Sequence, residues 1–334
     1  MNSAPSTSSV ARDQGSATCR GGDSGVRRAT PKVSIGLAVY NGEQYLAEAL
    51  ESILAQTFRD FELVICDNNS TDSTPEICAR YAAKDTRIRY YRNPINIGGV
   101  RNENRSMFLA RGSYFKLAAH DDNIAPRFLE ECVAVLDANP DVEVCSTGAY
   151  FIDAGSNITE TRTPRAGTED RLHHRIRSIA RFDDACEATY GLMRMRALKE
   201  VRPQTNHLHS DRIVLTELAL RRPFHLIEIP LFYKRIHEGN AYRDLRGRMA
   251  WFQPELTLTG RIRLPHWQQA ADYLTMLSRS RIDPLERLRC GAEVLRCIWR
   301  MRRYLAIDVV DGVRMFLRGK GGRCRRYMDE SRWR

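Results

Sequence analysis

The sequence lacks the marks of a membrane-spanning, secreted or zinc-binding protein. No uncharged apolar run approaches the roughly 18 residues that a transmembrane helix needs, and residues 1–30 have no apolar centre of the signal-peptide kind. The nine cysteines are scattered, with no C-x-x-C pair and no His/Cys spacing typical of zinc, so we expect reduced, mostly buried thiols. These absences lead us to expect a cytoplasmic protein.

Lysine is scarce, and the positive charge is unevenly distributed. Only six of the 52 basic residues are lysines, and the net charge is +11. Residues 287–334 hold 14 Lys and Arg against five Asp and Glu, so that nine of the eleven surplus charges lie there. A basic balance raises nucleic acid or an anionic membrane as partner. Because the rest of the chain is nearly neutral, we expect no nucleic-acid partner.

The alternation of apolar and amphipathic segments predicts an α/β protein. Residues 1–30 are rich in Ser, Thr, Gly and Ala, a composition typical of disorder. After them we predict strands at 33–39, 61–66, 88–92 and 114–117, separated by helices at 43–55, 73–84 and 101–110. Strands separated by single helices indicate parallel pairing.

The second half of the chain predicts a less regular succession of elements. We expect a helix from about 126 to 138, strands at 142–147 and 150–152, a turn-rich stretch at 155–185, a helix at 213–220, a strand at 227–236, and helices from 254 to about 317. We accordingly divide the chain into a disordered segment (1–30), an α/β domain (31–250) and a basic helical extension (251–334).

Acidic side chains follow two predicted strands, at the edge where a parallel sheet has its ligand crevice. They are Asp67 with Asp72, and Asp121 with Asp122. Adjacent carboxylates repel each other and persist most easily beside a divalent cation, for which oxygen ligands favour Mg²⁺ or Mn²⁺. A diphosphate is the natural bridging ligand of such a cation. The same residues also suit turns and helix caps. Neither a G-x-G-x-x-G nor a P-loop is present, so we expect no glycine cradle for a nucleotide.

An ordered series of motifs resembles the family 2 glycosyltransferases of the GT-A fold. The series comprises VYNGEQYL at 39–46, ALESILAQT at 49–57, FELVICDNNSTD at 61–72, NIG at 96–98, ARGSY at 110–114 and HDDNIAP at 120–126. The resemblance covers about residues 33–237. It implies an α/β fold with a Rossmann-like mixed sheet flanked by helices, here followed by a C-terminal helical extension, and an enzyme that transfers a sugar from a nucleotide-diphosphate donor.

The resemblance also implies roles for individual residues around the donor. Asp67 would accept the imide hydrogen of a uracil-type or thymine-type base, Asp121 would face the ribose, and Asp122 would hold Mg²⁺ or Mn²⁺. The other implied nucleotide-binding residues are Ala38, Val39, Tyr40, Glu43, Asn69 and Arg101. Arg101 equally suits a solvated position in the first turn of a helix. Ala119 stands where the usual D-x-D signature has an acid, so this chain carries a variant form.

Family members that invert the anomeric centre carry a carboxylate base before a helix in the second half, and Asp211 matches that position. Its task would be to accept the proton of an acceptor hydroxyl; it also suits a helix N-cap. Arg235 and His237 match the Y-x-R-x-H element of the family and would contact the diphosphate or close over it, unless they are plain surface residues. For His207 and His209 we do not predict a metal site.

The C-terminal helices carry apolar residues at helical spacing among arginines. The apolar positions are Leu288, Leu295, Ile298, Trp299, Leu305, Val309, Val313 and Phe316. Such helices either pack on the catalytic domain or lie on the anionic inner face of the bacterial plasma membrane, where lipid-linked sugar acceptors reside. We expect an inverting transferase acting on a cell-envelope glycan or lipid-linked saccharide, with a UDP- or dTDP-sugar favoured through Asp67. The alternatives are a nucleotide-sugar-binding pseudoenzyme and a nucleotidyltransferase.

Overall fold

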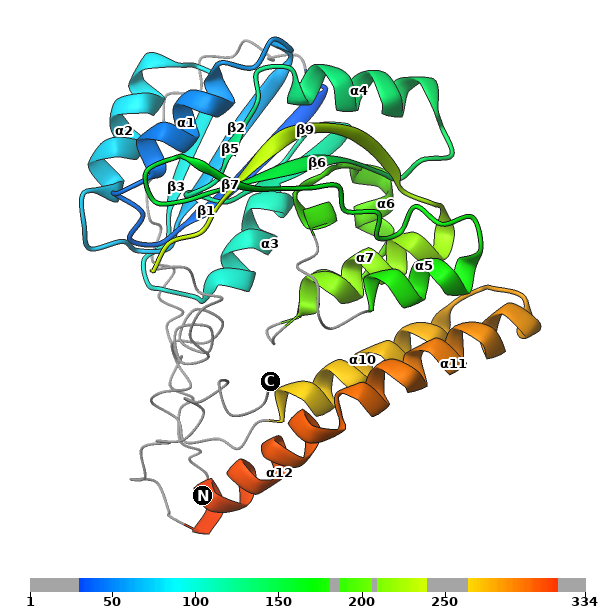
Figure 1. Ribbon diagram of the computed structural model, residues 1–334. Helices are drawn as coiled ribbons and strands as arrows, with labels where there is room; N and C mark the ends of the chain where they lie inside the picture. Colours follow the sequence, from blue (N-terminus) through cyan, green and yellow to red (C-terminus); the bar gives the residue numbers. More distant parts are fainter. Residues whose placement is uncertain (1–29, 181–186, 206–208, 239–263, 318–334) are drawn as a thin grey trace, which may run out of the picture. The chain divides into compact units, whose positions relative to one another are not determined.

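A mixed β-sheet forms the centre of the structure (Figure 1). The computed structural model describes residues 30–180, 187–205, 209–238 and 264–317. In these residues the strands follow the order β3-β2-β1-β4-β8-β6-β9-β5, and β7 pairs with β6. The strands are β1 (Val33–Val39), β2 (Phe61–Asp67), β3 (Ile88–Arg92), β4 (Tyr114–Ala118), β5 (Asn123–Ile124), β6 (Val144–Ile152), β7 (Ile158–Arg162), β8 (Leu192–Arg194) and β9 (His225–Arg235).

The first four strands are parallel, as the sequence predicts. β1 pairs with β2 and β4, and β2 pairs with β3, each in parallel register. Every residue of β2 and nearly every residue of β1 is buried, as expected for central strands covered on both faces. β8 joins β4 and β6 in antiparallel register, while β9 runs parallel to β6. The sheet is therefore mixed, and its parallel half brings the loops after β1, β2 and β4 to one edge.

Helices cover both faces of this sheet (Figure 1). On one face lie α1 (Leu46–Leu54), α2 (Thr74–Lys84) and α4 (Phe128–Ala138). On the other lie α3 (Gly99–Leu109), α5 (Leu172–Ile179), α6 (Met195–Glu200) and α7 (Ser210–Arg221), together with the 3-10 turn η1 (Glu187–Tyr190). Helix α7 is buried on two sides, because Leu215 and Leu218 pack toward the sheet while Ile213 faces the C-terminal helices.

The C-terminal helices α10 (Pro265–Arg279), α11 (Pro284–Arg300) and α12 (Arg302–Leu317) form a further layer against α5 and α7. Their apolar core includes Tyr273, Val294 and Met301, and it contacts Ile176 of α5. A buried pair, His266 Nδ1 with Asp308 Oδ1 at 2.9 Å, links α10 to α12. None of the helices in the described ranges is long and apolar enough to span a bilayer.

The sequence-based elements differ from the structure in several places. The short elements β5, η1, β8 and α6 were not predicted. The stretch 155–185, expected to be turn-rich, contains β7, which is exposed and pairs with β6, and the eight-residue helix α5, which is stabilised by packing. The two strands expected at 142–147 and 150–152 are one strand, β6, with a register shift around Gly148. Residues 1–29, the boundary at 250 and His207 lie outside the described residues, so the proposed division of the chain stays a prediction.

Candidate active site

Hydrogen bonds tie the loop after β1 to the loop after β2. Three backbone amides of the first loop donate to side chains of the second: Asn41 to Ser70 Oγ at 3.0 Å, Gly42 to Thr74 Oγ1 at 2.9 Å, and Glu43 to Asp72 Oδ2 at 3.0 Å. Asp72 also accepts from the Thr74 amide at 3.0 Å. Asp72 therefore shapes the two loops at the start of α2, which is the turn and cap role that the sequence left open.

Asp67 lies at the end of β2 and is fully buried. One carboxylate oxygen accepts from the Ser70 amide at 2.8 Å, and the other from the Tyr90 hydroxyl at 2.9 Å, with Arg92 Nε at 3.3 Å. Burial and the hydrogen bond to Asp67 raise the pKa of Tyr90. Asp67 thus fixes the loop that follows it. Its contact with the base stays a prediction, because each carboxylate oxygen can accept more than one hydrogen bond.

Sequence reasoning missed a network of asparagine side chains beside Asp67. Asn93 Nδ2 donates to Asn68 Oδ1 at 2.8 Å and to Asn102 Oδ1 at 2.9 Å, while Asn102 Nδ2 donates to the Cys66 carbonyl at 2.6 Å. Asn68 Nδ2 in turn donates to Asn96 Oδ1 at 2.7 Å. These bonds join the ends of β2 and β3 to α3. The available signal was the recurrence of asparagine in three consecutive loops.

The other predicted nucleotide-binding residues lie at the same edge of the sheet. At the end of β1, Ala38 is half-buried and Val39 is buried, whereas Tyr40 follows with 40% of its surface exposed. Asn69 is half-buried with a left-handed backbone (φ 64°), and Arg101 is exposed in the first turn of α3. The structure groups these residues, and their contact with a nucleotide stays a prediction.

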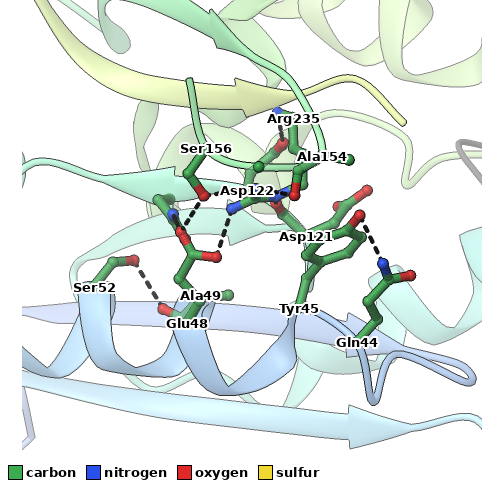
Figure 2. A network of polar contacts seen from close by, with 12 residues as sticks. Gln44, Tyr45, Glu48, Ala49, Ser52, Asp121, Asp122, Ala154, Ser156 and Arg235 are labelled. Carbon is green, nitrogen blue, oxygen red and sulfur yellow. Dashed lines mark hydrogen bonds and ion pairs between the residues drawn. The ribbon is translucent and has the colours of Figure 1, made fainter. Parts of the chain in front are cut away.

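The acidic pair Asp121 and Asp122 follows β4 and is held by Arg235 at the end of β9 (Figure 2). The Arg235 amide donates to Asp122 Oδ1 at 2.9 Å, and its Nε donates to the Asp121 carbonyl at 2.9 Å. His237 Nε2 lies 3.1 Å from Asp121 Oδ2. The end of β9 thus supplies the groups that orient both carboxylates. Gly42 permits this packing, because a Cβ there would lie 2.6 Å from His120 Cδ2.

The Arg235 side chain itself is in the interior. It has no exposed surface, and its Nη2 pairs with Glu48 Oε2 at 2.8 Å. Nη1 donates to the Asp153 carbonyl at 3.2 Å, and the guanidinium lies 4.5 Å from the Tyr45 ring centroid. A guanidinium so enclosed positions its neighbours. For Arg235 and for His237, which has 13% of its side chain exposed, contact with a diphosphate stays a prediction.

Within the acidic pair, Asp122 is the residue whose negative charge is disfavoured by its surroundings. Burial and the neighbouring Asp121 carboxylate raise the pKa of Asp122, although Lys234 and Lys116 partly oppose this. Lys116 is fully buried under the pair, and its Nζ donates to the carbonyls of Leu117 and Tyr190 at 3.1 and 3.0 Å. Burial lowers the pKa of Lys116 to about 8. The local charge is therefore balanced by protein cations only in part.

These residues fit a Mg²⁺ or Mn²⁺ ion that is held mainly by a ligand. In the described ranges no three His, Cys, Asp or Glu side chains converge as a protein-only metal site. Mg²⁺ is commonly bound by one or two carboxylates together with substrate phosphates, and Asp122 is a carboxylate whose charged form would gain from a nearby cation. Ala119, half-buried before the pair, removes one further carboxylate.

Asp211 lies in the first turn of α7 beside a small pocket of about 40 Å³. The N-cap position is His209, so Asp211 is not the cap. Within the described residues, the Asp211 carboxylate contacts the side chain of Thr189, with Oγ1 at 3.3 Å, and no cation lies at ion-pair distance. The pocket adjoins β4 through Phe115 and Leu117. Only four residues separate Leu117 from Asp122 in the chain, so their Cα atoms lie within about 18 Å.

A second carboxyl group, Glu103 of α3, lines the same pocket, and sequence reasoning missed it. Burial and the Asp211 charge raise the pKa of Glu103 to about 8, while a hydrogen bond from Gln204 opposes the rise. Glu103 is therefore predominantly protonated at neutral pH. A carboxyl group with a strongly raised pKa is typical of sites where proton transfer occurs.

Comparisons with known proteins agree with this geometry. A family model described as "Glycosyl transferase family 2" matches residues 34–202, half of the chain. The chain is 35% identical over 136 residues to an uncharacterized glycosyltransferase of Methanocaldococcus jannaschii, a match that covers 40% of this chain and 47% of that protein. It is 39% identical over 124 residues to the Bacillus subtilis protein EpsE, covering 37% and 45%. The chain thus spans about half the length of the curated relatives it matches.

A solved structure shares the fold over most of its length. The crystal structure of S. aureus TarS (residues 1–349) aligns with a TM-score of 0.62 at 17% identity, covering 86% of this chain and 80% of that one. TarS has also been solved in complex with UDP-GlcNAc. At this identity the likeness shows the fold alone.

Proposed function

The chain belongs to glycosyl transferase family 2 and has the GT-A fold, and we propose that it transfers a sugar from a nucleoside-diphosphate donor to an acceptor hydroxyl with inversion at C1. As acceptor we propose a cell-envelope glycan or a lipid-linked saccharide. The family assignment removes the nucleotidyltransferase alternative.

We propose Asp211 as the catalytic base, and the observation that carries this is its lack of a cationic partner within the described residues. A carboxylate that is not neutralised by a salt bridge can accept the proton of the acceptor hydroxyl. As the acceptor oxygen forms its bond to C1, the bond from C1 to the diphosphate oxygen breaks, and the nucleoside diphosphate leaves with its electron pair. Protonated Glu103 stands beside Asp211 without adding a second negative charge.

Asp122 would hold Mg²⁺ or Mn²⁺, with Asp121 oriented toward the ribose. The bound cation would supply Lewis-acid stabilisation of the charge that develops on the departing diphosphate. The protein contributes orientation, because the Arg235 amide donates to Asp122 and the guanidinium donates to the Asp121 carbonyl. Contacts with Asp153 and Glu48 hold Arg235 itself, and none of these four contacts depends on the ligand.

The pyrimidine preference rests on the proposed contact of Asp67 with the base. The shared fold with TarS, which has been solved in complex with UDP-GlcNAc, makes a UDP-sugar the first donor to test. Tyr40 is the exposed aromatic side chain at the end of β1 and is our candidate for contact with the base. dTDP-sugars remain the second choice.

Calorimetric titration with UDP, dTDP, GDP and ADP, each with and without Mn²⁺, tests donor binding. We expect one pyrimidine diphosphate to bind in a Mn²⁺-dependent manner and Asp122→Ala to lose that dependence. Release of nucleoside diphosphate from the matching sugar donor then tests turnover, where Asp211→Asn should lower kcat by about 10²-fold or more with little change in donor Kd.

A binding-only protein is the second candidate, and Ala119 in place of the usual acid favours it. The same assays distinguish the transferase from the binding-only protein. A pseudoenzyme binds the nucleotide sugar but shows no turnover above that of Asp211→Asn. Full turnover with a cell-envelope acceptor supports the transferase.

A further inference from the structure

A polar groove lies between α5 and α11, on the far side of α7 from the sheet (Figure 1). It has a volume of about 630 Å³ and is lined by Asp170, Arg171, Leu172, His173, Arg175, Glu286 and Arg289. None of the residues assigned above to the donor, the cation or the base lines it. The groove is therefore separate from the candidate active site.

Arg175 is the unusual member of the groove. It is only 7% exposed, and its buried Nε has no hydrogen-bond partner. Burial lowers the pKa of Arg175, although the charges of Glu169, Asp170 and Glu286 oppose this shift. None of these or the other described carboxylates lies within ion-pair distance of its guanidinium. Buried arginines are ordinarily paired, because an isolated buried charge is costly. This side chain thus lacks an anion that its surroundings would favour.

The acid nearest to Arg175 on α11 does not fill this need. Glu286 accepts from Arg289 Nη1 at 2.6 Å and lies 3.2 Å from His173 Nδ1. With Glu286 engaged, the lining retains the guanidinium groups of Arg171 and Arg175 against the exposed carboxylate of Asp170. The first turn of α5 also opens into the groove, and helix N-termini favour anions.

We propose that this groove binds a phosphate group, supplied by the headgroup of an anionic phospholipid. The planar guanidinium of Arg175 offers the paired donors that suit phosphate oxygens. The lipid source follows from α11, where Leu285, Leu288, Leu295 and Trp299 are each more than half exposed. Their spacing places them along one helical stripe that begins beside the groove. An apolar stripe next to a phosphate site matches one leaflet of a membrane, in which phosphate headgroups lie beside the apolar acyl chains.

Vesicle sedimentation with the full chain tests this proposal. The probes are vesicles of phosphatidylcholine alone and of phosphatidylcholine with phosphatidylglycerol, at constant ionic strength. Arg175→Met is compared with Arg177→Met, which removes the same charge from an exposed position on α5 outside the groove. Loss of one non-specific surface charge weakens anionic-membrane binding by about fivefold. We therefore expect vesicle binding to weaken by no more than about fivefold for Arg177→Met and by about tenfold or more for Arg175→Met.

Thermal unfolding keeps the test independent of folding defects and of the transferase activity. Without a ligand, Arg175→Met should be at least as stable as the native protein, since it removes an unpaired buried charge. Without divalent cations, inorganic pyrophosphate should raise the Tm of the native protein and of Arg177→Met by more than that of Arg175→Met, whose remaining rise measures binding at the candidate donor site. Nucleotide binding should be unchanged in all three.

Equal loss of vesicle binding in the two variants would overturn the site and indicate diffuse electrostatics. Stabilisation by pyrophosphate without binding to phosphatidylglycerol vesicles would overturn the lipid source. A variant that unfolds at a lower temperature would overturn the claim that Arg175 is unpaired.

Discussion

Replacement of Arg235 by methionine provides the sharpest test of how the acidic pair is held. The substitution keeps the backbone amide that donates to Asp122, so only the guanidinium contacts are lost. These are the bonds to the carbonyls of Asp121 and Asp153, the bond to Ser156 Oγ at 2.9 Å, and the ion pair with Glu48. The long apolar side chain of methionine fills most of the space beside Tyr45.

The cost follows from what each former partner does next. Breaking a fully buried ion pair costs about 3–5 kcal/mol, but Glu48 is 44% exposed and regains water, which lowers that figure. The Asp121 carbonyl is less accessible, and an unsatisfied buried acceptor costs about 1–3 kcal/mol. We therefore expect Arg235→Met to lower the free energy of unfolding by about 2–4 kcal/mol.

Urea unfolding followed by far-UV circular dichroism measures this change, with Arg127→Met as the matched control. Arg127 also pairs with two carboxylates, Glu130 and Glu131, but on the surface of α4, so its loss should cost less than about 1 kcal/mol. The m-value should stay constant in both variants. Equal stability of the two variants would refute the view that Arg235 is a structural anchor. Undiminished Mn²⁺-dependent nucleotide binding in Arg235→Met would refute its role in orienting the pair.

Three further predictions concern buried groups around the site. The pKa of Glu103 is about 8 in the folded protein against an ordinary value near 4.5, so the folded state binds the extra proton between these pH values. The free energy of unfolding should therefore fall by up to about 5 kcal/mol as pH rises from 4.5 to 8. Urea unfolding at a series of pH values measures this slope, which Glu103→Gln should abolish. The pKa of Lys116 is about 8 in the folded protein against an ordinary value of 10.5, so here the unfolded state binds the extra proton. The free energy of unfolding should rise by up to about 3 kcal/mol between pH 8 and 10.5 relative to that of Lys116→Met. The same pH dependence of this free energy in the two proteins would contradict the prediction. Gly42→Ala places a methyl group 2.6 Å from His120 Cδ2, which should lower the free energy of unfolding by about 1–3 kcal/mol and lower the Tm. An unchanged Tm would show that the loops that carry Gly42 and His120 can move apart at little cost.

The parallel half of the sheet was predictable because local pattern and burial agree there. β1 and β3 have the predicted bounds, since each is a short apolar run whose neighbours are turn residues. The helices began two or three residues later or earlier than predicted, as in α1 at Leu46, where no side-chain cap marks the start. β7 and α5 escaped prediction because β7 is exposed along its whole length and α5 is made stable by contacts with α11.

The location of the site was predictable from the sequence, but the roles of its individual residues were less so. Motifs indicate that Asp67, Asp122 and Arg235 belong to one edge of the sheet, and the structure brings them there. They do not reveal which oxygens are already engaged, because that depends on partners distant in sequence such as Tyr90 and Glu48. Glu103 was overlooked for the same reason, since its proximity to Asp211 joins helices 100 residues apart in the chain.

Buried groups that lack a full set of partners therefore carry more functional information here than motif matches do. Asp67 and Arg235 match motifs and make several contacts within the protein, so they maintain the site. Burial and a neighbouring carboxylate disfavour the charge of Asp122, while Asp211 and Arg175 line pockets and have unfilled bonding capacity. A fold retains such groups at a cost to its stability. The cation, the acceptor hydroxyl and the lipid phosphate are the respective partners that would offset this cost, and each can be added separately to the same protein.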